Sequence, residues 1–255
     1  MTIRSWFLAG AVLLGSTTFG VHDASSSRLA PLPTVVAADV PMYPRAAIAA
    51  RTSGTVHVTV STDGQKIGSV RVLGEPSALS AMAADNLKTW RFAPHAATSF
   101  DVSYRFTILT RGCESLGRDA HAAATLHFPT AVDVFAEVDG TCPGAAAPPP
   151  AFGIYITRAA VPFYPAAARD RGIQGDVSVN VSQKGELTIA EGPDELAAPM
   201  VVAIRTWQFS PPPFPEPVRF TFKLADGDCN SGGPTVSVGP GLTSFEITSL
   251  RTCGR

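Results

Sequence analysis

The four cysteines are the residues of this chain best suited to covalent chemistry. They are Cys113, Cys142, Cys229 and Cys253. An even number of cysteines in an exported chain is typical of disulfides, and four cysteines allow three connectivities. No two of them have the C-x-x-C spacing that favours a zinc site. We therefore expect two disulfides, and the choice among connectivities depends on how the rest of the chain is organised.

The sequence gives little support to other chemistry. It lacks the H-E-x-x-H, G-x-S-x-G, P-loop and G-x-G-x-x-G motifs of common enzymes. The five histidines are scattered, and the adjacent carboxylates of Asp194 and Glu195 point apart. The net charge is -1, and no basic run is long enough for a nucleic-acid surface. We expect no catalytic residue, no cofactor, no metal ion and no nucleic-acid partner.

The first twenty residues have the features of a secretory signal peptide. Arg4 is followed by an apolar stretch over residues 6–15 and by small residues over 16–20. This stretch is shorter than the roughly 20 apolar residues that span a bilayer. We expect residues 1–20 to be removed in the periplasm, and residues 21–39 to be a flexible lead-in. The alternative is an uncleaved inner-membrane anchor with the rest of the chain facing the periplasm.

The two halves of the chain repeat each other. The repeated segments are Tyr43-Pro44 with Tyr164-Pro165, Gly54 to Ser61 with Gly175 to Ser182, and Trp90-Arg91-Phe92 with Trp207-Gln208-Phe209. Such a repeat predicts two tandem domains, residues 40–142 and 154–255, joined by a Pro/Ala linker over 143–153. Each copy ends in a tail with two cysteines, which favours the pairs Cys113–Cys142 and Cys229–Cys253.

Each copy has the pattern helix, strand, strand, helix, strand, which predicts an α+β fold. Alternating valines from Val56 to Val60 predict a half-buried strand, and Asp63-Gly64 predicts a hairpin turn. Apolar residues at helical spacing predict a helix from Leu79 towards Trp90. In the second copy we expect this helix to begin near Pro199, because proline inside a helix costs about 3 kcal/mol.

In their order and spacing, the motifs Tyr-Pro, Gly-x-Val-x-Val, x-Gly and Trp-x-Phe-x-Pro resemble the TonB C-terminal domain family. The resemblance covers residues 41–109 and 162–224. It implies a small antiparallel sheet of three strands packed against two helices. In TonB itself this domain adds an extended segment of an outer-membrane receptor to its sheet edge, and so couples a proton-driven inner-membrane complex to transport. By that example the peptide-binding edge is the third strand, with residues Phe100, Val102, Tyr104, Phe106, Ile108, Val218, Phe220, Phe222 and Leu224.

The chain departs from a TonB transducer in its short apolar segment, its short spacer and its two disulfide-closed tails. Strand-like pieces in each tail are expected to pair with the third strand and to cap it. We therefore expect a periplasmic, non-catalytic protein that binds an envelope protein or peptide by strand recognition. A TonB-dependent outer-membrane receptor is one candidate partner. The alternatives are a membrane-anchored energy transducer and, from another class, an envelope hydrolase with a site between the domains.

Overall fold

The computed structural model describes residues 32–111, 123–139, 156–182, 184–209, 217–226 and 233–251. The residues described from Leu32 onward belong to one compact unit. The predicted signal peptide, the predicted linker and all four cysteines lie outside the described residues, so the disulfides stay predictions.

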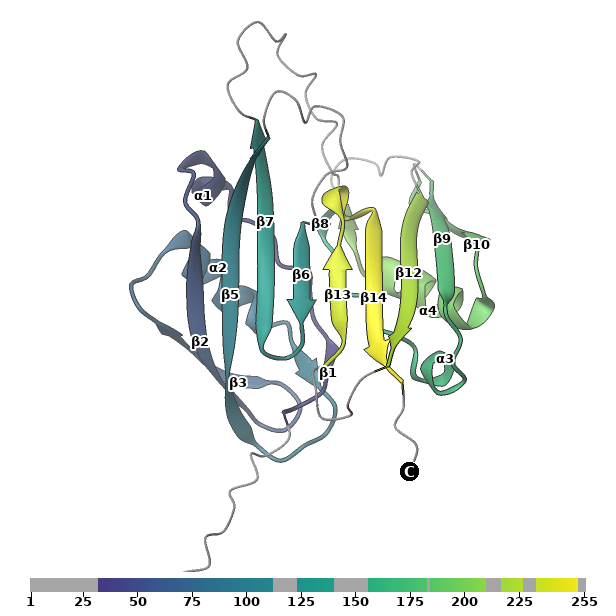
Figure 1. Ribbon diagram of the computed structural model, residues 1–255, viewed down its shortest axis with the longest axis horizontal. Helices are drawn as coiled ribbons and strands as arrows, with labels where there is room; N and C mark the ends of the chain where they lie inside the picture. Colours follow the sequence, from purple (N-terminus) through teal and green to yellow (C-terminus); the bar gives the residue numbers. More distant parts are fainter. Residues whose placement is uncertain are drawn as a thin grey trace, which may run out of the picture. The chain divides into compact units, whose positions relative to one another are not determined.

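Ten strands form one sheet in the order β10-β9-β12-β14-β13-β6-β7-β5-β2-β3 (Figure 1). In the first half the elements are β1 (Val35–Ala37), α1 (Arg45–Ala49), β2 (Gly54–Thr62), β3 (Ile67–Leu73), α2 (Ala78–Leu87), β4 (Arg91–Phe92), β5 (Thr98–Arg111), β6 (Ala124–His127) and β7 (Ala131–Asp139). In the second half they are β8 (Ile156–Arg158), α3 (Ala166–Asp170), β9 (Gly175–Val181), β10 (Leu187–Glu191), α4 (Asp194–Ile204), β11 (Gln208–Phe209), β12 (Pro217–Ala225), β13 (Thr235–Val238), a 3-10 turn (Pro240–Leu242) and β14 (Ser244–Leu250). This is the α+β class that the sequence predicted.

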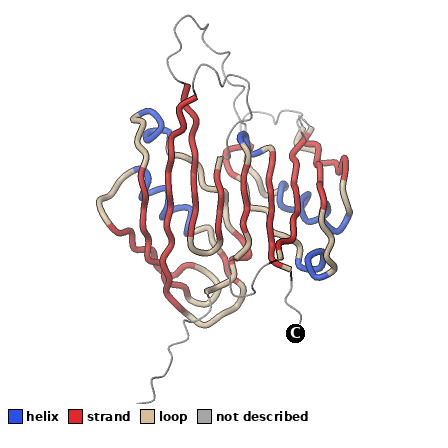
Figure 2. The backbone as a smooth tube through the Cα atoms, in the orientation of Figure 1, coloured by secondary structure: helices blue, strands red, loops and turns tan. Residues whose placement is uncertain are grey.

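One face of the sheet packs against the helices, and the other face is polar. Along β2, Val56, Val58 and Val60 are buried, whereas His57 between them is exposed. Paired residues of neighbouring strands point to the same side of a sheet, and the registers place the buried residues of the two halves on one face. The helices, blue in Figure 2, lie against this face, α2 on β2 and β3, and α4 on β9 and β10.

The two halves of the sheet have the same strand order and matching registers. Read inward from each end, a hairpin strand is followed by its partner, by the third strand and by the two tail strands. In the first half Ser103 of β5 lies opposite Ala131 of β7, and in the second half Arg219 of β12 lies opposite Ser244 of β14. Both third strands pair in parallel with their tail strand. The sequence repeat is therefore also a repeat of structure.

The halves join where β6 pairs antiparallel with β13, a contact that we call the seam. The pairs across the seam are Thr235–His127, Val236–Leu126, Ser237–Thr125 and Val238–Ala124. Thr125 and Ser237 are equivalent residues, because they pair with the equivalent residues Asp133 and Glu246 of the neighbouring strands. Each half therefore contacts the other through the same residues, with the Thr125–Ser237 pair at the centre. The subunits of a two-fold symmetric dimer contact each other in this way.

A second reciprocal contact lies in the segments that lead into each half. Val40 N–H donates to Ala159 C=O, and Val161 N–H donates to Ala38 C=O, both at 2.8 Å. Between them, Asp39 forms a β-bridge with Ala160, its counterpart in the repeat. The short strands β1 and β8 precede these segments and pair with β4 and β11. The sequence pattern predicts no strand at β1 or at β8.

The tail of each half covers the third strand, as predicted, but the second tail strand does so rather than the first. β7 pairs with β5 and β14 pairs with β12, while β6 and β13 take the outer positions and form the seam. The lengths explain this order. β5 has 14 residues and β7 has nine, whereas β6 has four. The longer tail strand offers more ladder hydrogen bonds to the long third strand.

The expected start of the helix of the second half near Pro199 is wrong. α4 begins at Asp194 and contains Pro199 in its interior. The first turn is held without help from Pro199, because Leu196 and Ala197 are fully buried and their N–H groups bond to Pro193 C=O. Asp194 and Glu195 add favourable negative charge at the N-terminal end. Together these contacts offset the hydrogen bond that Pro199 cannot make.

Replacing Pro199 by alanine is expected to stabilise the protein. The new N–H can donate within the helix, and the side chain is exposed, so the unfolding free energy should rise by roughly 1–3 kcal/mol. The matched control is Met82→Pro at the equivalent place of α2, which should lower it by about 3 kcal/mol or more. Urea unfolding followed by circular dichroism measures both. A Pro199→Ala protein less stable than the wild type would contradict this account of α4.

Candidate functional site

The residues predicted for the peptide-binding edge lie on the third strands, β5 and β12, and their side chains point into the core. The buried ones, none more than 8% exposed, are Phe100, Val102, Tyr104, Phe106, Val218, Phe220 and Phe222. Ile108 and Leu224 are partly buried against the same core. These side chains therefore serve packing. A partner strand could use only the backbone of these strands.

The backbone of both third strands is occupied on each flank. β5 lies between β2 and β7, and β12 lies between β9 and β14. Each third strand thus already holds an added strand, which comes from the tail of its own half. An extended partner could pair with β5 or β12 only if β7 or β14 left. The peptide-binding role of the third strands stays a prediction.

The register of these pairs bears on the disulfide prediction. β5 ends at Arg111 and β7 at Asp139, and these two residues are partners in the parallel ladder. In the second half Ala225 and Leu250, at the ends of β12 and β14, are partners as well. Neighbouring strands lie about 4.8 Å apart, and the Cα atoms of a disulfide lie about 4.4–6.8 Å apart. The four cysteines follow these strand ends in the sequence but lie outside the described residues, so pairing within each half stays a prediction.

The free edges of the sheet are β3 and β10, and they differ. The turn that leads into β3 is covered, since Lys66 forms a bridge with Arg91 and Phe92 N–H donates to Gln65 C=O at 2.7 Å. Arg71 adds a charge in the middle of β3. Along β10, no strand or bridge of the described residues lies on the outer side. Of the two edges, β10 is the one without a covered entry and without a charge before its last residue.

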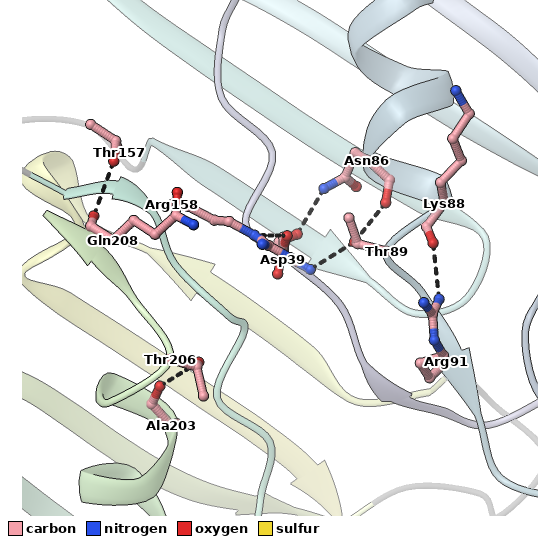
Figure 3. Close-up of polar contacts among 10 residues, drawn as sticks. All are labelled: Asp39, Asn86, Lys88, Thr89, Arg91, Thr157, Arg158, Ala203, Thr206 and Gln208. Carbon is pink, nitrogen blue, oxygen red and sulfur yellow. Dashed lines mark hydrogen bonds and ion pairs between the residues drawn. The ribbon is translucent and has the colours of Figure 1, made fainter.

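A polar network joins the halves at Asp39 (Figure 3). Its backbone N–H donates to Thr89 Oγ1 at 2.9 Å, and its C=O accepts from Asn86 Nδ2 at 2.8 Å. The Asp39 carboxylate accepts from Arg158 Nε of the second half at 2.6 Å. Asn86 and Thr89 belong to α2 and the turn after it. The network therefore holds the segment around Asp39, which contacts the second half, against α2 of the first half.

Asn86 is the buried centre of this network, with 5% of its surface exposed. Its Oδ1 accepts from Tyr104 Oη at 2.7 Å and from Trp90 Nε1 at 3.3 Å. Burial raises the pKa of the Tyr104 phenol well above its ordinary value, so this hydroxyl remains a donor. One amide thus satisfies a tyrosine of the sheet, a tryptophan of the core and the carbonyl of Asp39. The sequence analysis missed Asn86, because a single polar residue on an apolar helix face gives no motif.

The second half lacks the same network. Ala203 is the equivalent of Asn86, since each lies four residues before the tryptophan of its half. Phe220 is the equivalent of Tyr104, because the two have the same register on the third strand. Ala203 and Phe220 offer no side-chain acceptor. Trp207 Nε1 is the one buried side-chain nitrogen or oxygen without a hydrogen-bond partner among the described residues. The two halves therefore share packing but differ in polar contacts, and Figure 3 shows Ala203 and Thr206 away from Asp39.

Other contacts are the same in both halves. The Tyr43 hydroxyl donates to Thr52 C=O, and the Tyr164 hydroxyl donates to Ile173 C=O. Tyr43 meets Phe106 edge-on, with ring centroids 5.5 Å apart. The corresponding pair in the second half, Tyr164 with Phe222, has centroids 5.2 Å apart. The tyrosine of the Tyr-Pro motif thus ties the first helix of each half to the third strand.

The described residues contain no group of three or more His, Cys, Asp and Glu side chains that could hold a metal ion. In the same part of the chain, no helix is both long and apolar enough to span a membrane.

Comparison with known families assigns the first half. Residues 39–110 match the family model described as the Gram-negative bacterial TonB protein C-terminal. No curated protein and no solved structure matches the chain. Residues 39–110 therefore match the TonB C-terminal domain family, as the motifs predicted for the first copy. The matched segment runs from Asp39 to β5 and stops before the tail.

The network at Asn86 predicts an asymmetric response of the two halves. Asn86→Ala leaves Trp90 Nε1, the Tyr104 hydroxyl and Asp39 C=O without a partner, so the unfolding free energy should fall by about 2–4 kcal/mol. The matched variant Ala203→Asn offers an acceptor to Trp207 Nε1, so it should be neutral or stabilising by up to about 1 kcal/mol. Chemical denaturation measures both. Equal losses in the two variants would show that Asn86 is an ordinary helix residue.

Proposed function

We propose that this protein is a periplasmic, non-catalytic protein that recognises extended polypeptide segments by strand addition, with both halves being TonB C-terminal domains. The observation that supports this most is the sheet itself. Each third strand, the element that binds receptor segments in TonB, already holds an added strand in parallel. The fold of each half therefore accepts strand addition at the place the family uses. The equal registers and the repeated tyrosine contacts support a common origin of the halves.

The proposed partner is an envelope protein or peptide, and a TonB-dependent outer-membrane receptor is the first candidate. Recognition of this kind uses backbone hydrogen bonds for affinity and alternate side chains for specificity. It needs no catalytic group, no cofactor and no metal ion. The alternative, an anchored energy transducer, would use the same strand recognition but retain residues 1–20 in the inner membrane.

Binding of receptor segments tests this proposal. Synthetic peptides that cover the periplasmic N-terminal segments of TonB-dependent receptors from the same cell are added to the purified oxidised protein. Hydrogen exchange should show new backbone protection along at least one strand edge, since added strands satisfy edge N–H groups. The control peptides carry the same residues with N-methylated backbones, which cannot complete the ladder.

Absence of protection at every edge, with no receptor retained from envelope extract, would contradict strand recognition. Cell fractionation separates the two forms of the proposal. A mature chain that starts near residue 21 and is released by osmotic shock supports the periplasmic form. A chain that keeps Met1 in the inner membrane supports the anchored transducer.

A further inference from the structure

β10 is an outer strand of the sheet, whereas the third strands β5 and β12 are already paired on both flanks. We propose that β10 binds an extended polypeptide segment with alternating apolar residues and a basic residue at each end. This inference rests on the proposed function, strand recognition, and assigns its site and the chemistry of its ligand.

β10 is accessible to a partner strand. It ends the sheet, and its one strand partner among the described residues is β9. Residues 188–191 are all exposed. At the other end of the sheet, the turn that leads into β3 is covered by the Lys66–Arg91 bridge and by the hydrogen bond from Phe92. A partner at β10 therefore displaces no described strand, whereas a partner at β5 or β12 displaces a tail strand.

The exposed apolar side chain on this edge also favours a partner strand. Ile189 of β10 is 42% exposed. It pairs with the buried Val179, so it points to the helix side of the sheet, where α4 lies against β10. The outer strand of the second half thus presents an apolar side chain that a partner strand can cover.

The charges in and beside β10 also favour a partner strand with basic ends. Sheet edges are commonly protected by a charged residue within the strand. β3 has Arg71 in that position, but β10 reads Leu187-Thr188-Ile189-Ala190 and has no charge before its last residue. Two carboxylates stand at its ends, Glu186 and Glu191, and neither forms an ion pair with any described residue. An uncharged strand between two unpaired carboxylates is complementary to an apolar strand between two basic residues.

The test uses a labelled peptide, acetyl-Lys-Val-Thr-Val-Thr-Val-Lys-amide, and the full oxidised protein. Its valines can contact Ile189 while its backbone pairs with β10. We expect saturable binding by fluorescence anisotropy and new hydrogen-exchange protection over Leu187–Glu191. A peptide with Glu in place of both Lys residues should bind about tenfold more weakly, and an N-methylated peptide should not bind.

Protein variants locate the site. Ile189→Lys places a charge in β10 like that of Arg71 in β3 and should weaken binding about tenfold or more. Its matched control is Val72→Lys, at the equivalent register of β3, which should leave the affinity unchanged. Glu186→Gln with Glu191→Gln should abolish the preference for Lys over Glu ends. Thermal melting of each variant checks the fold.

The outcomes distinguish the β10 site from strand recognition in general. Protection over β5, β12 or β3, with Ile189→Lys binding as the wild type does, would overturn the β10 site and leave strand recognition standing. Failure of this peptide while receptor segments protect another edge would do the same. Self-association through β10, seen as concentration-dependent mass in light scattering and abolished by Ile189→Lys, would assign this edge to a second copy of the chain and overturn the proposed ligand. If neither the receptor segments nor the Lys-ended peptide protects any edge, both the β10 site and strand recognition are contradicted.

Discussion

The pairing of β6 with β13 is the contact on which the rest of this structure depends. The four inward side chains of the seam, Ala124, Leu126, Val236 and Val238, are fully buried, so the seam is part of the core. A separated half would expose a sheet edge and an apolar strip at this place, which is a hazard for aggregation. Joining the halves here removes both inner edges. The edges that remain are β3 and β10, at the far ends of the sheet.

The reciprocal seam explains how a duplicated segment can become one sheet without new structural parts. Each half contributes the same tail strand, and the two tail strands meet as in a symmetric dimer. The halves then differ in side chains. The first half has the Asn86 network, which holds Asp39, and Asp39 also binds Arg158 of the second half. The second half has an exposed Ile189 on an outer strand that carries no charge before its last residue. The halves therefore share a fold but differ in their polar contacts and in their outer edges.

Much of the fold of each half could be predicted from its sequence. Alternating valines located β2 and β9, because the alternation is a local pattern. Apolar spacing located α2, although α2 ends at Leu87 rather than at Trp90. The start of α4 could not be predicted, since burial of Leu196 and Ala197 outweighed the propensity of Pro199. The seam and the short strands β1 and β8 depend on contacts between distant residues and leave no local pattern. Asn86 was missed for a similar reason, since two of its three partners, Asp39 and Tyr104, lie 47 and 18 residues away in the sequence.

Hydrogen exchange across the seam tests the central claim most directly. Ala123 N–H donates to Val238 C=O at 2.6 Å, and Phe128 N–H donates to Pro234 C=O at 3.2 Å, so these two amides report on the contact between the halves. If the halves form one sheet, both amides should exchange as slowly as the amides at the centres of β2 and β9. If both exchange at the rate of unstructured chain while β2 and β9 stay protected, the halves are separate domains and this account is contradicted.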